Sequence, residues 1–265
     1  MSDRTAIEWT EASWNPVRGC SVVSPGCKNC YAMKMAHRFS GKGGVYEGLT
    51  KMSKGGPVWT GAARTVPELL DAPLHWKKPR RIFVNSMSDL FHEDVPTDFI
   101  AQVFVVMAEA KRHTFQILTK RAERMQQLLA HDLNYEGPEW PLPNVWLGVS
   151  VEDQVRADER IPLLLQTPAA VRFVSYEPAL GPVDWSRFHG LNWIIIGGES
   201  GAQARRFDWE WARSTIAQCR QIGAAPFMKQ TGTDYTALYE RVQKDRNGAD
   251  PAEWPQDLRI REYPA

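Results

Sequence analysis

Short apolar runs alternate with longer amphipathic stretches along most of this chain. The runs predict strands and the stretches predict helices, which is the pattern of a parallel sheet covered by helices. The predicted strands are 81–85, 115–119, 145–150, 171–175, 193–197 and 225–229, after a first strand near 8–15. The predicted helices are 31–39, 98–109, 122–129, 157–165 and 209–222, the last ended by Gly223. The pattern therefore predicts an α/β fold, a full or partial TIM-like barrel with parallel strands.

The length of 265 residues suits one barrel domain over 1–265. Two segments depart from the alternation of strands and helices. Residues 41–64 are rich in glycine and predict an inserted loop or hairpin, and residues 233–265 predict a C-terminal extension over the barrel. Most of the eleven tryptophans are expected in the core.

Each predicted strand passes from apolar residues to polar or ionisable ones at its carboxyl end. Those ends gather on one face of a parallel barrel, where active sites occur. The candidate catalytic residues are therefore Asp89, Lys120, Glu152 and Glu177. Lys120 and Arg121 suit an anionic group, or a salt bridge to Glu152 or Glu123. The basic runs 77–81 and 111–113 precede their strands and are read as solvated charge on the opposite face.

Charge and hydropathy narrow the class of protein. Lys and Arg number 32 against 31 Asp and Glu, so net charge gives no case for nucleic-acid binding, although a local basic rim is compatible with it. No apolar run is long enough for a bilayer, and the first residues lack the apolar region of a signal peptide. We expect a soluble, cytoplasmic protein with no membrane partner.

Three of the four cysteines, Cys20, Cys27 and Cys30, lie within eleven residues of one Gly/Pro-containing segment. Three thiolates leave one iron of a [4Fe-4S] cluster without a protein ligand, and a cofactor or substrate can bind there. A zinc site ranks second because it needs a fourth ligand, and a disulfide ranks third. Cys219 falls on the apolar stripe of a predicted helix and is read as a buried thiol. We place the cysteine loop at the carboxyl face of the barrel, with Asp89, Lys120, Glu152, Glu177 and Glu199 converging around it.

The cysteine segment also resembles a known motif. The run Asn15-Pro16-x-Arg18-Gly19-Cys20 … Gly26-Cys27-x-x-Cys30-Tyr31-Ala32 resembles the cluster loop of radical S-adenosylmethionine enzymes, particularly those similar to spore photoproduct lyase. The spacing here is C-x6-C-x2-C, where those enzymes typically carry C-x3-C-x2-C. From Trp9 to Gly232 the chain resembles a phage-associated three-cysteine-motif family of unassigned function. The shared blocks are 88–92, 118–121, 146–152, 173–178 and 197–201.

The resemblance implies a radical S-adenosylmethionine-like lyase or transferase that uses a [4Fe-4S] cluster and S-adenosylmethionine. It implies that Gly197, Gly198, Glu199 and Ser200 contact the cofactor, although paired glycines at a strand end also make a tight turn on their own. The implied partners are a nucleic-acid or nucleoside substrate and an electron-donor protein. The alternatives are a non-radical [4Fe-4S] enzyme that binds its substrate at the open iron, or a zinc-stabilised phage protein that binds nucleic acid or a partner without catalysis.

Overall fold

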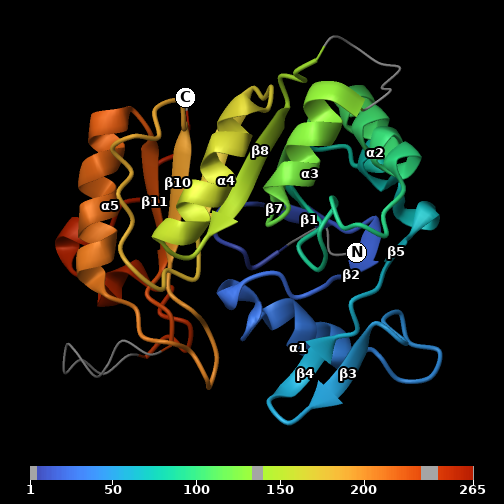
Figure 1. Cartoon of the computed structure of the whole chain (residues 1–265), viewed down its shortest axis with the longest axis horizontal. Helices are drawn as coiled ribbons and strands as arrows, with labels where there is room; N and C mark the ends of the chain where they lie inside the picture. The colour runs from blue at the N-terminus through green and yellow to red at the C-terminus, as the bar shows by residue number, and fades with distance from the viewer. Residues whose placement is uncertain (1–4, 133–139, 234–243, 265) are drawn as a thin grey trace. The chain divides into compact units, whose positions relative to one another are not determined.

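The computed structural model describes residues 5–132, 140–233 and 244–264. The chain divides into two compact units. Unit 1 holds residues 1–147 and 166–170, and unit 2 holds residues 148–165 and 171–265. Figure 1 follows the chain from blue to red. Within the described ranges, no helix is both long and apolar enough to cross a bilayer.

Unit 1 contains three parallel strands that carry the polar strand ends. Ala12 pairs with Ile82 and Ile82 pairs with Phe115, so β1, β6 and β7 run side by side. Their inward residues, such as Trp14 and Phe115, are fully buried, as the apolar runs predict. The strands and helices of this part are β1 (Ala12–Trp14), β6 (Arg81–Val84), β7 (Thr114–Thr119), α2 (Thr97–Glu109) and α3 (Ala122–Gln127).

The cysteine loop belongs to a smaller piece of unit 1, drawn in blue in Figure 1. The strand β2 pairs antiparallel with β5, and β3 pairs antiparallel with β4 to form a hairpin. One face of α1 buries Ala32, Met33 and Ala36 against Trp59 of this hairpin. The elements are β2 (Val17–Gly19), α1 (Tyr31–Arg38), β3 (Thr50–Ser53), β4 (Gly56–Trp59) and β5 (Ala63–Thr65). Within residues 41–64, where the sequence predicts an inserted loop or hairpin, β3 and β4 form a hairpin.

Unit 2 repeats the parallel arrangement. Trp193 pairs with both Phe173 and Ala225, so β10 lies between β9 and β11. Near the C-terminus, Arg261 forms an antiparallel bridge with Phe227. The elements are β9 (Val171–Tyr176), β10 (Trp193–Gly197), β11 (Ala225–Gln230), α4 (Gln154–Gln166) and α5 (Trp209–Ile222), and β8 (Val145–Val151) begins in unit 1 and ends in unit 2.

The order of hydrogen-bonded strands is β1-β6-β7-β8-β9-β10-β11. This order confirms the α/β class with parallel strands, and β1 and β11 at its two ends agree with a partial barrel. The strand boundaries lie close to those predicted, but the first strand is only Ala12–Trp14. The fourth predicted helix begins earlier, at Gln154, where Asp153 Oδ1 accepts the Arg156 N–H at 2.9 Å and caps the first turn.

Several residue-level expectations are confirmed. Gly223 follows α5 in the left-handed conformation, with φ of 77°, and Cys219 is completely buried. Trp14 and Trp185 are buried and donate their indole N–H groups within the core. The reading of 111–113 as solvated charge is wrong for His113, which is 1 % exposed and donates Nε2–H to the Pro73 carbonyl.

Candidate metal centre

The cysteine loop leaves β2 through Gly19. Gly19 has φ of 89°, and a Cβ at this position would lie 2.3 Å from the Ala62 carbonyl oxygen. Only glycine fits so close to that backbone. A short 3-10 turn over Pro25–Cys27 follows, and the backbone N–H of Cys30 donates to the Cys27 carbonyl at 3.3 Å. Cys30 then caps the start of α1, so the last two cysteines are separated by a single turn.

The loop after β6 fastens the start of the cysteine segment. Asn85, with φ of 61°, accepts a hydrogen bond from the Val17 N–H on its Oδ1 at 3.3 Å. Ser88 donates its hydroxyl to the Val17 carbonyl at 2.7 Å, and Asn15 accepts from the Met87 N–H at 3.1 Å. The loop that carries Asp89 is therefore tied to β2 by both backbone and side-chain hydrogen bonds.

Arg121 links this loop to the first cysteine. Its Nη1 donates to Cys20 Sγ at 3.8 Å and to Asp89 Oδ2 at 3.0 Å. Its Nη2 donates to the Ser21 hydroxyl at 2.5 Å, and its Nε donates to Glu93 at 3.0 Å. The fork of a guanidinium can satisfy several acceptors at fixed angles, so Arg121 orients the residues around Cys20.

Asp89 is buried and fully engaged. Besides Arg121, it accepts hydrogen bonds from the Thr119 hydroxyl at 2.7 Å, the Lys120 N–H at 3.2 Å and the Phe91 N–H at 3.0 Å. A buried carboxylate needs such partners because desolvation disfavours its charge. Asp89 therefore holds the guanidinium of Arg121 beside the thiol.

The three thiols share one electrostatic environment. Burial raises the pKa of Cys20 to about 12, with the Asp89 charge acting in the same direction and Arg121 against it. Burial also raises the pKa of Cys30, while the backbone N–H groups of Met33 and Ala32 and the charge of Lys120 act against it. A Cys27 thiolate would raise the pKa of both Cys20 and Cys30. The thiols of Cys20 and Cys30 are thus protonated without metal, and metal binding has to displace their protons.

The donor atoms fit a soft metal by type and number. All three are free thiols, and thiolates favour iron–sulfur clusters and zinc. Among the described residues, however, no group of three or more His, Cys, Asp or Glu side chains is arranged as a ligand set. A single ion held by all three thiols would require them to move together, whereas each thiolate of a cubane cluster ligates a different iron.

The other predicted site residues lie in unit 2 and have partners there. Glu152 is fully buried and pairs with Arg160 at 3.1 Å. Glu177 pairs with Lys229 at 2.5 Å. Glu199 accepts hydrogen bonds from Arg205 Nε at 2.9 Å and from Arg205 Nη2 at 2.7 Å. Each carboxylate is thereby held in a defined position.

The Gly-Gly segment is closely packed. A Cβ on Gly198 would lie 2.1 Å from the Thr231 carbonyl oxygen, and the N–H of Gly198 donates to the Gln230 carbonyl at 3.0 Å. The side-chain amide of Gln230 reaches Ser200 at 2.7 Å and Glu177 at 3.1 Å. Gln230 therefore connects the Gly-Gly-Glu-Ser turn with Glu177 inside unit 2.

Only some of the predicted site residues are placed together. Asp89 and Lys120 share unit 1 with the three cysteines, and the convergence of Glu152, Glu177 and Glu199 on the same loop stays a prediction. Arg121 pairs with Asp89 and Glu93, which are not the acidic partners named from the sequence. Sequence reasoning also missed the partners Arg160, Arg205 and Lys229. A strand-end position identifies an acidic residue, whereas its partner depends on contacts across the fold.

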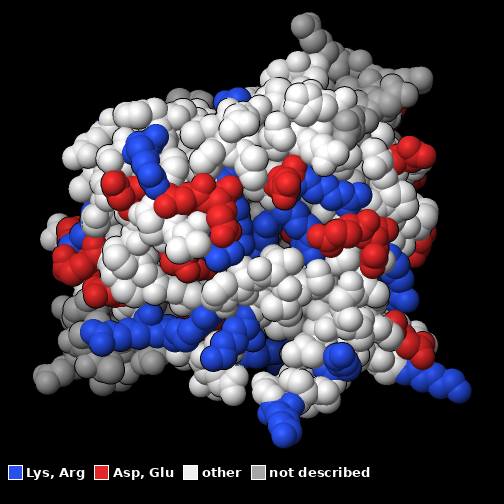
Figure 2. All heavy atoms as spheres, in the orientation of Figure 1, with Lys and Arg blue, Asp and Glu red and all other residues white. Residues whose placement is uncertain are grey.

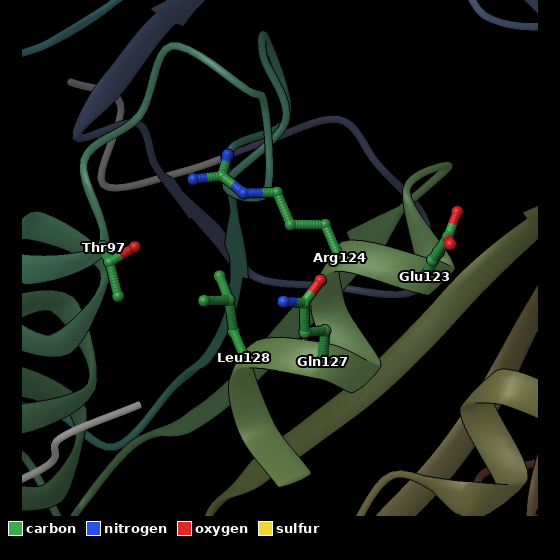
Figure 3. Close-up of a pocket in the computed structure, with 5 residues that line it drawn as sticks. All are labelled: Thr97, Glu123, Arg124, Gln127 and Leu128. Carbon is green, nitrogen blue, oxygen red and sulfur yellow. The ribbon is translucent and has the colours of Figure 1, made fainter. Parts of the chain in front are cut away.

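A separate cavity of about 550 Å³ lies in unit 1 between α2 and α3 (Figure 3). Its lining includes Arg124, whose guanidinium donates to the carbonyls of Phe91, His92 and Val95. None of the predicted site residues lines this cavity. The full lining is Thr97, Glu123, Arg124, Gln127 and Leu128.

The fold and site define an α/β protein with three free thiols on one loop. A family model described as a protein of unknown function (DUF5131) matches residues 4–255, and the chain belongs to that family. Among curated proteins the sequence has no significant match.

The chain is similar in structure to spore photoproduct lyase. A cysteine-to-serine mutant of that lyase has a TM-score of 0.45 and 11% identity, over 83% of this chain and 64% of that chain. A second mutant, with bound AdoMet and dinucleoside spore photoproduct, has a TM-score of 0.40 and 11% identity, over 79% and 61%. This chain thus spans less than two thirds of each.

Proposed function

We propose that this chain is an iron–sulfur enzyme that holds a [4Fe-4S] cluster through Cys20, Cys27 and Cys30 and binds S-adenosylmethionine at the remaining iron. The observation that supports the proposal most is the cysteine loop of unit 1. Three free thiols lie there, and a charge on Cys27 raises the pKa of both Cys20 and Cys30. Arg121 is hydrogen-bonded to Cys20, and Lys120 is near enough to lower the pKa of Cys30. Three ligands leave one position of a cubane cluster for an exogenous molecule.

The surrounding residues stabilise thiolates at this position. Arg121 contributes a guanidinium N–H to Cys20, and the start of α1 contributes the N–H groups of Ala32 and Met33 to Cys30. Hydrogen bonds and charges next to cluster sulfurs tune the reduction potential. When bound, the cluster supplies an electron for reductive cleavage of S-adenosylmethionine.

The proposal gives the remaining candidates roles in binding. Gly197, Gly198, Glu199 and Ser200 contact the cofactor, and Glu177 is held next to them through Gln230. Asp89 and Glu152 act as positioning residues because each is buried in an ion pair. Lys120 interacts with an anionic group of the substrate. The substrate class, a nucleobase or nucleic acid, and the need for an electron-donor protein rest on the resemblance of the cysteine motif.

Binding of S-adenosylmethionine tests the cofactor part of the proposal. Reduced, cluster-loaded protein is expected to change its electron paramagnetic resonance signal on adding S-adenosylmethionine and to release 5′-deoxyadenosine slowly. An intact cluster with neither change contradicts the use of this cofactor and favours an enzyme that binds its substrate at the open iron.

Glu199→Ala should weaken binding of the cofactor, and unaltered binding would show that the Gly-Gly-Glu turn is structural.

A further inference from the structure

Exposed apolar side chains gather in one short stretch of the chain. Of the eight large apolar residues that are exposed in the described residues, all but Val155 fall between positions 22 and 52. Single exposed apolar residues are common, but a cluster of them marks an interaction surface. The seven are Val22, Val23, Tyr31, Met35, Phe39, Val45 and Met52.

Three of them form a ridge along α1. Tyr31, Met35 and Phe39 follow one another at intervals of four residues, so they lie on one face and span about 12 Å of helix. They are 52, 39 and 54 % exposed. The opposite face of α1 is the one that packs on the β3–β4 hairpin. The ridge is therefore the outward face of a helix whose inward face is already covered.

Tyr31 is both exposed and held in place. It follows Cys30 directly, and its hydroxyl donates to the Ser86 carbonyl at 2.7 Å. Ser86 in turn donates to Asn15 at the start of the cysteine segment. An exposed aromatic ring with a fixed orientation loses little conformational entropy when a flat partner stacks on it.

The same stretch carries an excess of positive charge. Between positions 20 and 60 the sequence has six Lys and Arg residues and one acidic residue, Glu47. In the part of the chain that the structure describes, no ion pair is found for any of the six. Lys and Arg side chains protrude in Figure 2 where Figure 1 draws α1 and the β3–β4 hairpin. The six are Lys28, Lys34, Arg38, Lys42, Lys51 and Lys54.

The hairpin is attached firmly to the helix that carries the ridge. The His37 ring of α1 and the Thr50 hydroxyl of β3 are hydrogen-bonded at 3.0 Å, and Trp59 of β4 lies in the same apolar cluster as Met33 of α1. Lys51 and Lys54 are thus held beside the helix on the hairpin. We call this exposed surface the basic ridge, which consists of Tyr31, Met35, Arg38, Phe39, Lys42, Lys51, Met52 and Lys54.

We propose that the basic ridge binds single-stranded nucleic acid, with the backbone phosphates on its cations and bases stacked on Tyr31 and Phe39. Cations without an acidic partner attract the phosphates of a polyanion, and exposed aromatic rings can stack on unpaired bases. An acidic protein partner would use the same charge but would gain nothing specific from the aromatic rings. Tyr31 follows Cys30 directly, so a bound strand would lie next to the cysteine loop. The strand would then be the substrate of the enzyme proposed above, and this part of the inference rests on that proposed function.

The test measures binding by fluorescence anisotropy of a labelled oligodeoxythymidylate of about 16 nucleotides. The full chain without cluster is used, so failure of this proposal is separate from failure of the iron–sulfur proposal. Arg38→Glu/Lys51→Glu should weaken binding at least about tenfold and reduce the slope of log Kd against log salt by about 1.4, since each lost phosphate contact contributes about 0.7. Lys77→Glu/Lys78→Glu makes the same charge change at exposed residues elsewhere in unit 1 and should have little effect.

Phe39→Leu separates stacking from simple apolar contact. Leucine keeps the apolar character but has no ring, and the loss of one stacked base should weaken binding by at least about fivefold. The proposal is overturned if Arg38→Glu/Lys51→Glu and Lys77→Glu/Lys78→Glu lose affinity for the oligonucleotide equally. It is also overturned if the parent chain does not bind the oligonucleotide at low salt. Equal affinity of Phe39→Leu and the parent chain, with polyglutamate competing as well as the oligonucleotide, would identify an acidic-protein surface instead.

Discussion

At the residue scale, Asp89 and Arg121 form a buried ion pair at 3.0 Å next to the first cysteine. Breaking a buried pair leaves an uncompensated charge, which costs more than the pair itself contributes. Asp89→Asn should therefore lower the free energy of unfolding of metal-free protein by about 3 kcal/mol, as measured by urea denaturation. The exposed Glu68→Gln is the control and should change it by less than about 0.5 kcal/mol. Equal, small effects of the two variants would contradict this account of Asp89.

His113 makes a second prediction, which concerns pH. Burial lowers the pKa of His113 below its usual value of 6.5, with the Pro73 carbonyl acting against the shift and the charges of Arg112 and Arg80 with it. As pH falls below about 6.5, the unfolded chain takes up the proton before the folded chain does. Stability therefore decreases toward acid, by at most about 1.4 kcal/mol per pH unit for this group, and levels off below the folded pKa.

The measurement compares the pH dependence of unfolding between pH 7 and 5. His113→Gln should make the free energy of unfolding depend less steeply on pH. Part of the dependence should remain because burial also lowers the pKa of His92. The exposed His189→Gln is the control for the loss of one histidine. A slope unchanged by His113→Gln would show that His113 does not carry this effect.

Residue types at the site were predictable from the sequence, and their partners were not. The three cysteines are identified by spacing, and Asp89 and Lys120 by following a strand. That Asp89 holds Arg121, and that Arg121 reaches Cys20, depends on residues about 30 and 100 positions apart. No local pattern contains that information. The burial of His113 was missed for the same reason, because Pro73 lies 40 residues away.

At the scale of elements, the Gly-Gly turn after β10 depends on close backbone contact. Gly198→Ala should destabilise unit 2 by about 2 kcal/mol or more, because its Cβ would overlap the Thr231 carbonyl, and overpacking of this kind costs about 1–3 kcal/mol. Gly181→Ala is the matched control in the same unit, where the nearest heavy atom lies 3.9 Å from the added Cβ. Thermal unfolding of both variants checks the difference. Similar midpoints for the two would mean that the backbone at Gly198 moves apart at little cost.

The helices and strands themselves were largely predictable. Runs such as 193–197 are apolar and bounded by polar residues or glycine, so both type and limits follow from the sequence. The predicted boundaries of helices and strands were wrong where the apolar pattern of the sequence is weak. The first strand is only three residues long, and α4 begins three residues before its predicted start. The start of α4 follows Asp153, whose Oδ1 accepts the Arg156 N–H, a local cap that the apolar pattern does not reveal.

At the scale of the whole molecule, a nearly neutral net charge conceals a basic segment. The charges of the full chain balance, so composition gives no case for an anionic partner, whereas residues 20–60 carry an excess of cations beside the cysteine loop. The family match extends over residues 4–255 and therefore includes both the cysteine loop and the Gly-Gly-Glu turn. The function proposed above needs both segments.

The most direct test of the central claim is the iron and acid-labile sulfide content of protein reconstituted without oxygen. The account predicts a brown protein with about four irons and four sulfides per chain. Alanine in place of Cys20, Cys27 or Cys30 should abolish the cluster. Cys219→Ala is the matched control, since that thiol is buried in α5, and this variant should retain full iron and sulfide. Stoichiometric zinc without sulfide, or full iron and sulfide in a variant lacking one of the three loop cysteines, would contradict the account.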